Sequence, residues 1–241
     1  MEGKLLLLKI YEKRERILFF LLLLAAEVLG LTMISFLIYW CTQYEHGGYR
    51  GFTFEKKKSF SLHPFLMVLG LVYFYGHAAL AYRVVPKVQK LILKIVHASL
   101  NFAAICCVSI GLSAVFRFHN STGRSDFHSV HSWIGIITCT LFALQYVMGF
   151  LGFLFPKFPE KMRAFLLPIH QYVGQLVLIL TAATVISGCQ TMLPNTFSQE
   201  SVLLIWIAIL VVSFFAVVLY LVTSPRFKRT EQPSYSDAIN Q

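Results

Sequence analysis

The sequence predicts an all-α membrane protein with six transmembrane helices, the second to fifth of which form a four-helix bundle. Of the 241 residues, 57% are hydrophobic and only 13% are charged, and the mean hydropathy is +0.67. So few charged residues cannot cover a water-exposed surface. The same figures exclude disordered chains, collagen-like repeats and disulfide scaffolds, which leaves a polytopic membrane protein.

Six apolar stretches are long enough to cross a bilayer of about 30 Å, which takes roughly 20 helical residues. Helices are expected because hydrocarbon offers no partner to an open backbone group, and a barrel would show alternating polarity instead. The short connections between the stretches carry Pro, Gly, Ser and charged residues. The expected spans are 17–40, 62–85, 91–116, 130–155, 164–190 and 201–223.

The first and last spans are apolar on every face, from Ile17 to Ala26 and from Val202 to Val212. At about 24 residues the first span exceeds the 7–15 residues of a signal-peptide core, and it lacks a small-residue cleavage site. We therefore expect a membrane helix there. Residues 1–16 are expected as a cytosolic N-terminal segment, 17–223 as one membrane domain, and 224–241 as a cytosolic tail.

Lysine and arginine gather on one side of the predicted membrane, which the positive-inside rule identifies as the cytosol. Fifteen lie on that side and six on the other. The cytosolic set is Lys4, Lys9, Lys13, Arg14, Arg16, Arg83, Lys87, Lys90, Lys94, Lys157, Lys161, Arg163, Arg226, Lys228 and Arg229, and the outer set is Arg50, Lys56, Lys57, Lys58, Arg117 and Arg124. Both termini are therefore expected in the cytosol, and the net charge of +10 needs no nucleic-acid partner. Plasma, endolysosomal and secretory vesicle membranes all fit this pattern.

Two smaller features concern the outer side. Asn120-Ser121-Thr122 is a glycosylation sequon in a predicted outer loop, which agrees with the orientation.

The five cysteines show no metal-ligand spacing, and four lie inside spans as small apolar side chains. Cys41 and Cys189 would both lie near the outer face, where a disulfide between them is an option.

Four histidines recur at an interval that matches one membrane crossing plus a turn. His63, His97, His131 and His170 lie on spans two to five in order, separated by 34, 34 and 39 residues. They therefore alternate in depth, with His63 and His131 near the outer end and the other two near the inner end. At 1.5 Å per residue, the two levels are about 20 Å apart.

Two imidazoles that face each other at one level of a four-helix bundle can occupy both axial positions of a haem iron. A flat porphyrin needs small neighbours, and each histidine has one four or seven residues away on its own helix face. These are Gly70, Ala104, Gly135 and Gly174. The pattern predicts two haem sites, one near each membrane face.

Other interpretations of the buried polar residues stay open at this point. A single histidine in a membrane helix often only hydrogen-bonds to a neighbouring helix, and a non-haem metal site has too few ligands at either level. His77 and Glu27 are two further ionisable residues within spans, for which structural hydrogen bonding and proton handling are both options. His46 is expected as an ordinary loop residue.

The motifs around the four histidines resemble the cytochrome b-561 family, the ascorbate-dependent transmembrane di-haem reductases. The resemblance covers about residues 30–190. It rests on Ser-Leu-His63-Pro64, Tyr82-Arg83, Lys94-x-x-His97, Phe116-x-x-His119-Asn120, Ser129-Val130-His131-Ser132-Trp133 and Pro168-Ile169-His170. Two positions depart from the family pattern, which usually has Asn where Ser61 stands and Leu where Val130 stands, and both concern only the tuning of the outer haem.

The resemblance implies six helices, with helices two to five holding two haem b groups, and it implies a homodimer. It assigns His63 and His131 to the outer haem iron, and His97 and His170 to the inner haem iron. The predicted depths of the four histidines in the membrane lead to the same two pairs.

Basic residues at the inner end suit an anionic electron donor. Ascorbate is a monoanion at neutral pH, and Arg83, Lys90, Lys94 and Arg163 would attract it. Lys90 and Lys94 share one helical face with His97. Topology alone also places cations at inner helix ends, but the resemblance implies that these four contact ascorbate. Lys94 is predicted as the catalytic residue of this end.

Polar residues near the outer histidines suit an electron acceptor. His119 and Asn120 follow the third span, and Ser129 and Trp133 flank the histidine of the fourth. A loop imidazole and amide would ligate a ferric chelate or contact a semidehydroascorbate radical. We predict His119 as the catalytic residue here and the other three as substrate contacts. For His119 and His128, a role as solvated loop residues is the alternative.

Together these observations predict a transmembrane ferric reductase that carries single electrons from cytosolic ascorbate through two haems to ferric iron on the outer or luminal side. One alternative is the same electron path ending on the semidehydroascorbate radical. Another is a proton-coupled transporter without haem. Membrane lipid and a second copy of the chain are the expected partners, and no nucleic acid is expected.

Overall fold

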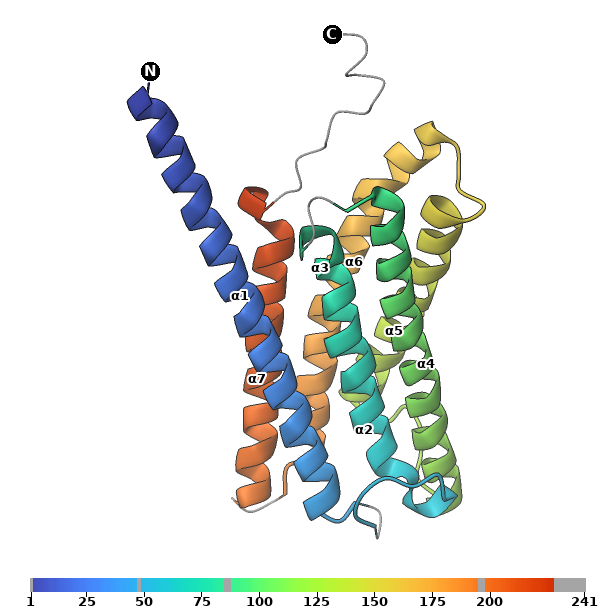
Figure 1. Cartoon of the computed structure of the whole chain (residues 1–241). Helices are drawn as coiled ribbons and strands as arrows, with labels where there is room; N and C mark the ends of the chain where they lie inside the picture. The colour runs from blue at the N-terminus through green and yellow to red at the C-terminus, as the bar shows by residue number, and fades with distance from the viewer. Residues whose placement is uncertain (1, 47–48, 85–87, 195–197, 228–241) are drawn as a thin grey trace.

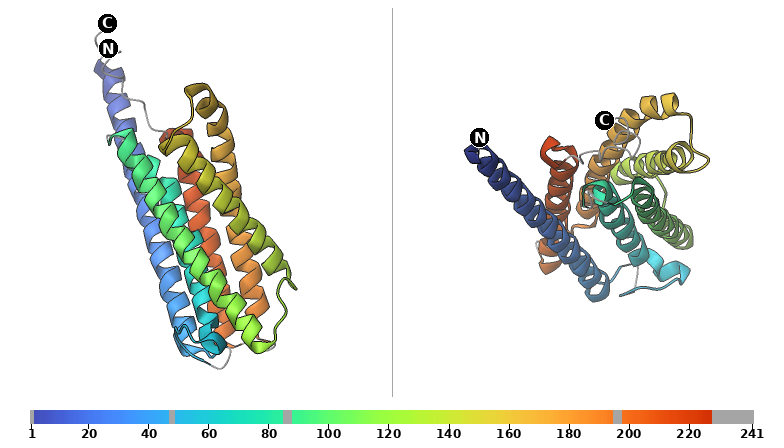
Figure 2. Two further views of the ribbon diagram at one scale, coloured as in Figure 1. Left: turned by 90° about the vertical axis from the view of Figure 1, so that its right-hand side faces the viewer. Right: turned by 45° about the horizontal axis from the view of Figure 1, so that its top comes forward.

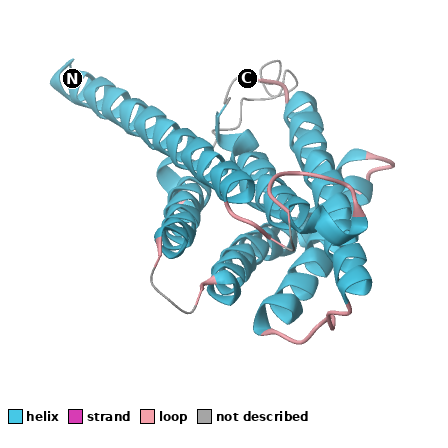
Figure 3. Ribbon diagram, turned by 90° about the horizontal axis from the view of Figure 1, so that it is seen from below, coloured by secondary structure: helices cyan, strands magenta, loops and turns pink. Residues whose placement is uncertain are grey.

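The computed structural model describes residues 2–46, 49–84, 88–194 and 198–227. All regular secondary structure within these ranges is helical (Figure 3). Six helical segments are long and apolar enough to cross a membrane, and they form one elongated bundle (Figure 1, Figure 2). The predicted all-α fold with six spans is confirmed, and the protein is a multi-pass membrane protein.

The six spans have the following bounds. The first is α1 (Glu2–Gln43). The second runs from the 3-10 helix η1 (Lys56–Ser61) through α2 (Leu62–Met67) and the π-helix η2 (Val68–Phe74) to α3 (Tyr75–Val84). The third is α4 (Lys90–Thr122), and the fourth is α5 (Val130–Gly149) with the π-helix η3 (Phe150–Leu154). The fifth and sixth are α6 (Glu160–Met192) and α7 (Gln199–Thr223), after which the 3-10 helix η4 (Pro225–Phe227) follows.

Two helices extend beyond their predicted spans. α1 is helical from Glu2, so residues 2–16 of the predicted N-terminal segment continue the first membrane helix. α4 continues to Thr122 and ends at Gly123, whose φ of +71° favours glycine. His119 and Asn120 therefore lie in the last turn of α4 and not in a loop. Hydropathy marks where the apolar stretch ends, whereas a helix can continue into water.

α1 begins and α7 ends at the same end of the bundle (Figure 1), as six crossings require. We call this the inner end, and the end that carries the α1–η1 loop the outer end. Residues 228–241 of the predicted tail lie outside the described residues. The same is true of three basic residues that were assigned to the cytosolic side, Lys87, Lys228 and Arg229. The division into an N-terminal segment, a membrane domain and a tail stays a prediction.

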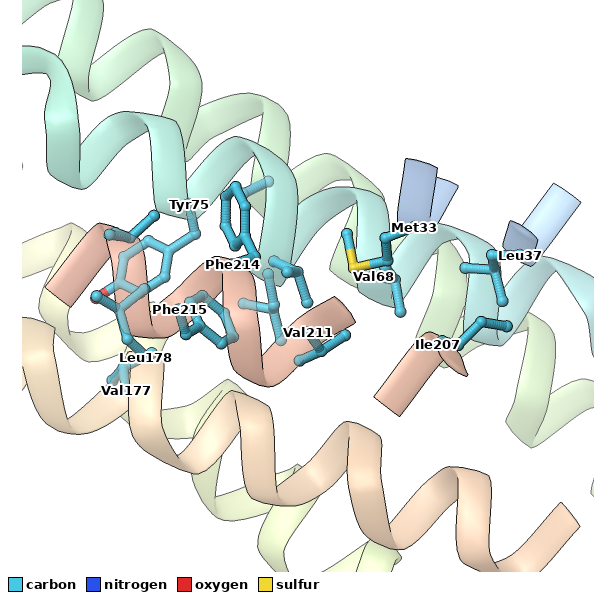
Figure 4. Close-up of a cluster of buried hydrophobic side chains, with 14 of the residues drawn as sticks. Met33, Leu37, Val68, Tyr75, Val177, Leu178, Ile207, Val211, Phe214 and Phe215 are labelled. Atoms are coloured by element: carbon cyan, nitrogen blue, oxygen red, sulfur yellow. The ribbon is translucent and has the colours of Figure 1, made fainter. Parts of the chain in front are cut away.

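The helices pack in pairs around a common apolar core. α1 packs along α7 and α5 along α6, while α2 and α3 pack on α4. In Figure 4, Tyr75 of α3 lies beside Phe215 of α7 and Leu178 of α6, and all three are buried. The Tyr75 hydroxyl donates a hydrogen bond of 2.9 Å to the Gly174 carbonyl of α6. Close packing of this kind holds membrane helices together, because lipid provides no hydrophobic drive between them.

The five cysteines are free thiols. Cys41 is buried, and its Sγ points to the carbonyl oxygen of Ser61 at 3.7 Å. The disulfide option between Cys41 and Cys189 is therefore not used in this structure.

The loop after α1 packs against the outer end of the bundle. His46, expected as an ordinary loop residue, is only 4% exposed, and its ring stacks on Trp40 with 3.8 Å between centroids. Trp40 Nε1 donates a hydrogen bond of 3.0 Å to Glu200 at the start of α7. Burial lowers the pKa of His46, and the Glu200 carboxylate offsets part of this effect. His46 is thus a packed residue beside the Trp40–Glu200 hydrogen bond, which joins α1 to α7.

Candidate functional site

Two of the four predicted histidines meet near the outer end. His63 of α2 and His131 of α5 have ring centroids 6.1 Å apart and ring planes at 86°. Nδ1 of His63 lies 3.2 Å from the Gly111 carbonyl oxygen, and Nδ1 of His131 lies 2.8 Å from that of Thr184. Because a carbonyl can only accept, each Nδ1 carries the proton. Each Nε2 keeps its lone pair for a ligand.

The other two histidines meet near the inner end. His97 of α4 and His170 of α6 have ring centroids 6.3 Å apart and planes at 67°. Nδ1 of His97 donates a hydrogen bond of 2.7 Å to the Ala78 carbonyl. Nδ1 of His170 is buried and has no hydrogen-bond partner within the described ranges, while its backbone carbonyl accepts from Gln145. The structure therefore brings together the two pairs that the depth argument predicts.

Both pairs fit the axial positions of a haem iron. An imidazole nitrogen binds a metal at about 2 Å and its ring centre lies about 1 Å further out, so two axial imidazoles have centroids about 6 Å apart. The observed separations are 6.1 Å and 6.3 Å. A carbonyl on Nδ1 is typical of metal-binding histidines. No cluster of three or more His, Cys, Asp or Glu side chains suited to a metal ion occurs within the described residues, so these pairs suit haem better than a bare ion.

Two glycines make room for the histidine rings. A Cβ on Gly149 of α5 would lie 2.8 Å from the His170 ring, and a Cβ on Gly188 of α6 would lie 2.9 Å from the His131 ring. Such distances are too short for a real side chain, so only glycine lets each ring occupy its place. Sequence reasoning missed both residues because each touches a histidine of a different helix.

The small residues that were predicted beside the porphyrins lie at contacts with other helices. A Cβ on Gly70 would lie 2.9 Å from the Cys107 Cβ and 3.0 Å from the Ala104 carbonyl oxygen of α4. Gly135 and Gly174 likewise face side chains of neighbouring helices. In this structure these residues allow close helix approach, a role that small residues commonly have in membranes.

Basic side chains gather beside the inner histidine pair. Lys94 Nζ donates a hydrogen bond of 2.9 Å to the Phe153 carbonyl, and the positive charges of Lys157, Arg163 and Lys90 act on it. Three of these cations belong to the predicted ascorbate site. Lys157 was not among the predicted ascorbate contacts. Nothing in the sequence shows that the segment after η3 approaches Lys94.

Arg83 makes different contacts from the other predicted basic residues. Its guanidinium donates to the carbonyl oxygens of Val222 and Ser224 at the C-terminal end of α7. A cation there satisfies open carbonyls and complements the helix dipole. Arg83 thus joins α3 to α7, and its contact with ascorbate stays a prediction.

A cavity of about 490 Å³ opens at the outer end, lined by His119, Arg124, Ser125 and His128. Nδ1 of His119 donates to the Asp126 carboxylate at 2.7 Å, and Nδ1 of His128 donates to the Ser125 carbonyl at 2.8 Å. Both Nε2 atoms are left with lone pairs. The cavity thus combines two imidazoles with a guanidinium.

The remaining predicted outer residues lie outside the set that lines this cavity. Asn120 is exposed on the last turn of α4. Ser129 caps α5, where its hydroxyl accepts from the Ser132 amide at 3.2 Å. Trp133 is 57% exposed and packs against Phe127 with 5.7 Å between ring centroids. Of the four residues predicted to contact the electron acceptor, His119 is the one that lines this cavity.

Comparison with known proteins agrees with this site. The family model of eukaryotic cytochrome b561 matches residues 62–195, which include all four paired histidines. The lysosomal membrane ascorbate-dependent ferrireductase of Homo sapiens is 39% identical over 233 residues, covering 91% of this chain and 94% of the relative. That of Danio rerio is 34% identical over 230 residues (88% and 91%), and a plasma membrane ascorbate-dependent reductase of Mus musculus is 34% identical over 223 residues (88% and 76%). The chain therefore belongs to the cytochrome b561 family.

Proposed function

We propose that this protein is a transmembrane ferric reductase that transfers single electrons from cytosolic ascorbate to ferric iron across the membrane. The observation that carries the proposal is the two facing histidine pairs, one near each end of a single membrane-spanning bundle. Relatives named as ascorbate-dependent ferrireductases and reductases support it. Membership of the family means that the chain binds haem b, and two haems per chain are part of our proposal.

In this proposal His63 and His131 hold the outer haem iron, and His97 and His170 hold the inner one. When bound, haem b supplies the one-electron redox chemistry. The chain supplies neutral imidazoles, which cost less to bury than charged ligands. For His63, His131 and His97, the carbonyl bonds on Nδ1 fix the ring orientations and make Nε2 a stronger donor.

The inner basic cluster would bind ascorbate. An anion beside Lys94 would meet the charges of Lys157, Arg163 and Lys90 together, because all three act on that ammonium group. Such a field raises the local concentration of an anionic donor and orients it. Lys94, which lies three residues before His97 on the same helix, is the proposed catalytic residue.

Replacing Lys94 by glutamine is expected to raise the ascorbate concentration needed for half-maximal haem reduction by about tenfold. The substitution removes the central charge of the cluster and leaves the haem ligands in place. Stopped-flow absorbance at several ascorbate concentrations measures the effect, and high salt should reduce the difference between variant and wild type.

Lys13→Gln is the matched control, because Lys13 is an exposed cation on α1 towards the same end. Dithionite, which needs no basic site, should reduce both variants fully. Unchanged ascorbate dependence in Lys94→Gln would exclude Lys94 from the donor site.

The outer cavity would bind an anionic ferric chelate. The two Nε2 lone pairs are suitable iron ligands, and Arg124 would pair with a carboxylate of the chelate. The Asp126 carboxylate on Nδ1 of His119 orients that ring and strengthens its Nε2 as a ligand. His119 is the proposed catalytic residue of this end.

The proposed function is tested with purified protein in vesicles that contain ascorbate inside and a ferric chelate outside. Wild type is expected to reduce the outside iron, and empty vesicles are not. His119→Ala should lower the rate of iron reduction by at least about tenfold while ascorbate still reduces the haems. A colourless preparation after expression with added haem, or no electron transfer across the membrane, would contradict the proposal.

The two alternatives have less support. Reduction of the semidehydroascorbate radical would use the same bundle, but two imidazoles and a guanidinium in one cavity suit a ferric chelate better. A haem-free transporter would leave the matched ring separations without a purpose.

We further propose that both termini face the cytosol, in a plasma or endolysosomal membrane. Fifteen of the 21 Lys and Arg residues lie on that side by the topology count, and relatives are named from both membranes. A homodimer is proposed on the family resemblance.

A further inference from the structure

Two ionisable side chains meet within the membrane, between α1 and α3. Glu27 lies near the centre of the span Ile10–Gln43, and one of its carboxylate oxygens is 2.7 Å from Nε2 of His77. The other oxygen accepts a hydrogen bond of 3.2 Å from the Tyr73 hydroxyl. A carboxylate within a membrane span is costly and usually functional, and the proposed function uses neither residue.

Both ring nitrogens of His77 and both carboxylate oxygens of Glu27 have polar contacts. Nδ1 of His77 lies 2.7 Å from the Tyr73 carbonyl oxygen, which can only accept, and Nε2 faces the carboxylate. Oxygen atoms thus face both ring nitrogens, a set of contacts that an imidazolium satisfies with its two N–H groups. Both carboxylate oxygens of Glu27 face groups that can donate, the imidazole and the Tyr73 hydroxyl. The geometry therefore suits an ion pair between α3 and α1.

Aromatic rings hold the pair in place. The Tyr73 ring lies 4.3 Å from the His77 ring, and the Phe214 ring of α7 lies 5.9 Å from it. Two glycines allow this approach, since a Cβ on Gly76 would lie 2.6 Å from Phe214 and one on Gly30 would lie 3.0 Å from Tyr73. The position of the imidazolium is therefore fixed by three elements.

His77 adjoins the residue that orients an inner haem ligand. Ala78 offers its carbonyl oxygen to Nδ1 of His97 at 2.7 Å. α3 packs on α4, which carries His97, and the Glu27–His77 contact joins α3 to α1 on its other side. Through His77, Glu27 is therefore linked to the segment of α3 that orients His97. The rings of the outer histidine pair, His63 and His131, are oriented by different carbonyl groups, those of Gly111 and Thr184.

We propose that Glu27 is a positioning residue for the inner haem, acting through His77. It keeps His77 charged beside the Ala78–His97 hydrogen bond, and this positive charge raises the reduction potential of the inner haem. A nearby cation in a low-dielectric interior stabilises an added electron, which favours acceptance of an electron from ascorbate. The inference rests on the proposed function for its assignment of the inner haem.

The test is a redox titration of both haems in full-length protein, with Glu27→Gln compared with wild type. The amide cannot balance a positive His77, so the inner haem should become about tenfold harder to reduce at equilibrium, a shift of about −59 mV for one electron. The outer haem of the same molecule is an internal control and should not move. Glu200→Gln, which makes the same change beside Trp40 at the outer end, should leave the inner potential unchanged.

His77→Gln keeps the inference testable if Glu27→Gln does not fold. It should lower the inner potential by at least as much, because it removes the positive charge directly, and adding Glu27→Gln to it should lower the potential no further. Inner potentials equal to wild type in these variants, or equal shifts of both haems, would overturn the inference and leave the proposed function intact. A wild-type protein without two haems would instead overturn the proposed function.

Discussion

Replacing His97 or His170 by alanine is expected to remove the inner haem and to abolish reduction by ascorbate. The two ring centroids are 6.3 Å apart, so either change removes one of the two side chains that would hold the iron and opens a cavity in an apolar site. The outer pair is oriented by carbonyls of other residues. Each variant should therefore hold about half of the wild-type haem.

The measurements are the haem-to-protein ratio and the reduced-minus-oxidised absorbance spectrum. Ascorbate should reduce little of the haem in these variants, whereas dithionite should still reduce the outer haem. His46→Ala is the matched control for haem content, because it removes a buried histidine that is not a proposed ligand. A protein with both His97→Ala and His170→Ala that kept two full haems would refute the ligand assignment.

Replacing Gly188 by leucine is expected to remove the outer haem only, and replacing Gly149 by leucine the inner haem only. A Cβ at these positions would lie 2.9 Å from the His131 ring and 2.8 Å from the His170 ring. His131 cannot turn away without losing its hydrogen bond to Thr184. Overpacking of a core typically costs about 1–3 kcal/mol, so the helices should still assemble while the ring loses its position as a ligand.

Haem content and ascorbate-driven iron reduction separate these two variants. Gly188→Leu should keep an inner haem that ascorbate reduces but should not pass electrons to outside iron. Gly149→Leu should keep a haem that ascorbate does not reduce. Gly30→Leu is the control for overpacking, because its Cβ would lie 3.0 Å from the Tyr73 ring and none of its three nearest atoms belongs to a paired histidine. Full haem content in both leucine variants would show that neither glycine borders a haem site.

The pairing of the histidines could be predicted because it depends on depth, and depth follows from counting residues along apolar helices. His63 and His131, like His97 and His170, meet in the bundle as the 34- and 39-residue intervals require. The limits of α1 and α4 could not be predicted as well, since a helix continues beyond the membrane where hydropathy falls.

Contacts between helices could not be predicted, because one sequence carries no information on helix rotation. Gly149 and Gly188 touch histidines of other helices, and Lys157 approaches Lys94 from a distant connection. Glu27 and His77 were two separate buried residues in the sequence, and only the packing of α1 on the bundle brings them to 2.7 Å. His46 was expected as an ordinary loop residue, but its ring packs on Trp40.

The sequence by itself determined the membrane class, the six spans, the family and the depth of each paired histidine, because these follow from composition and from residue counts along a regular helix. Only the tertiary structure decided which carbonyl orients each ring, which glycines admit the rings, and which charges act near each end. These features depend on the rotation and close approach of helices, which side-chain packing across the whole bundle sets.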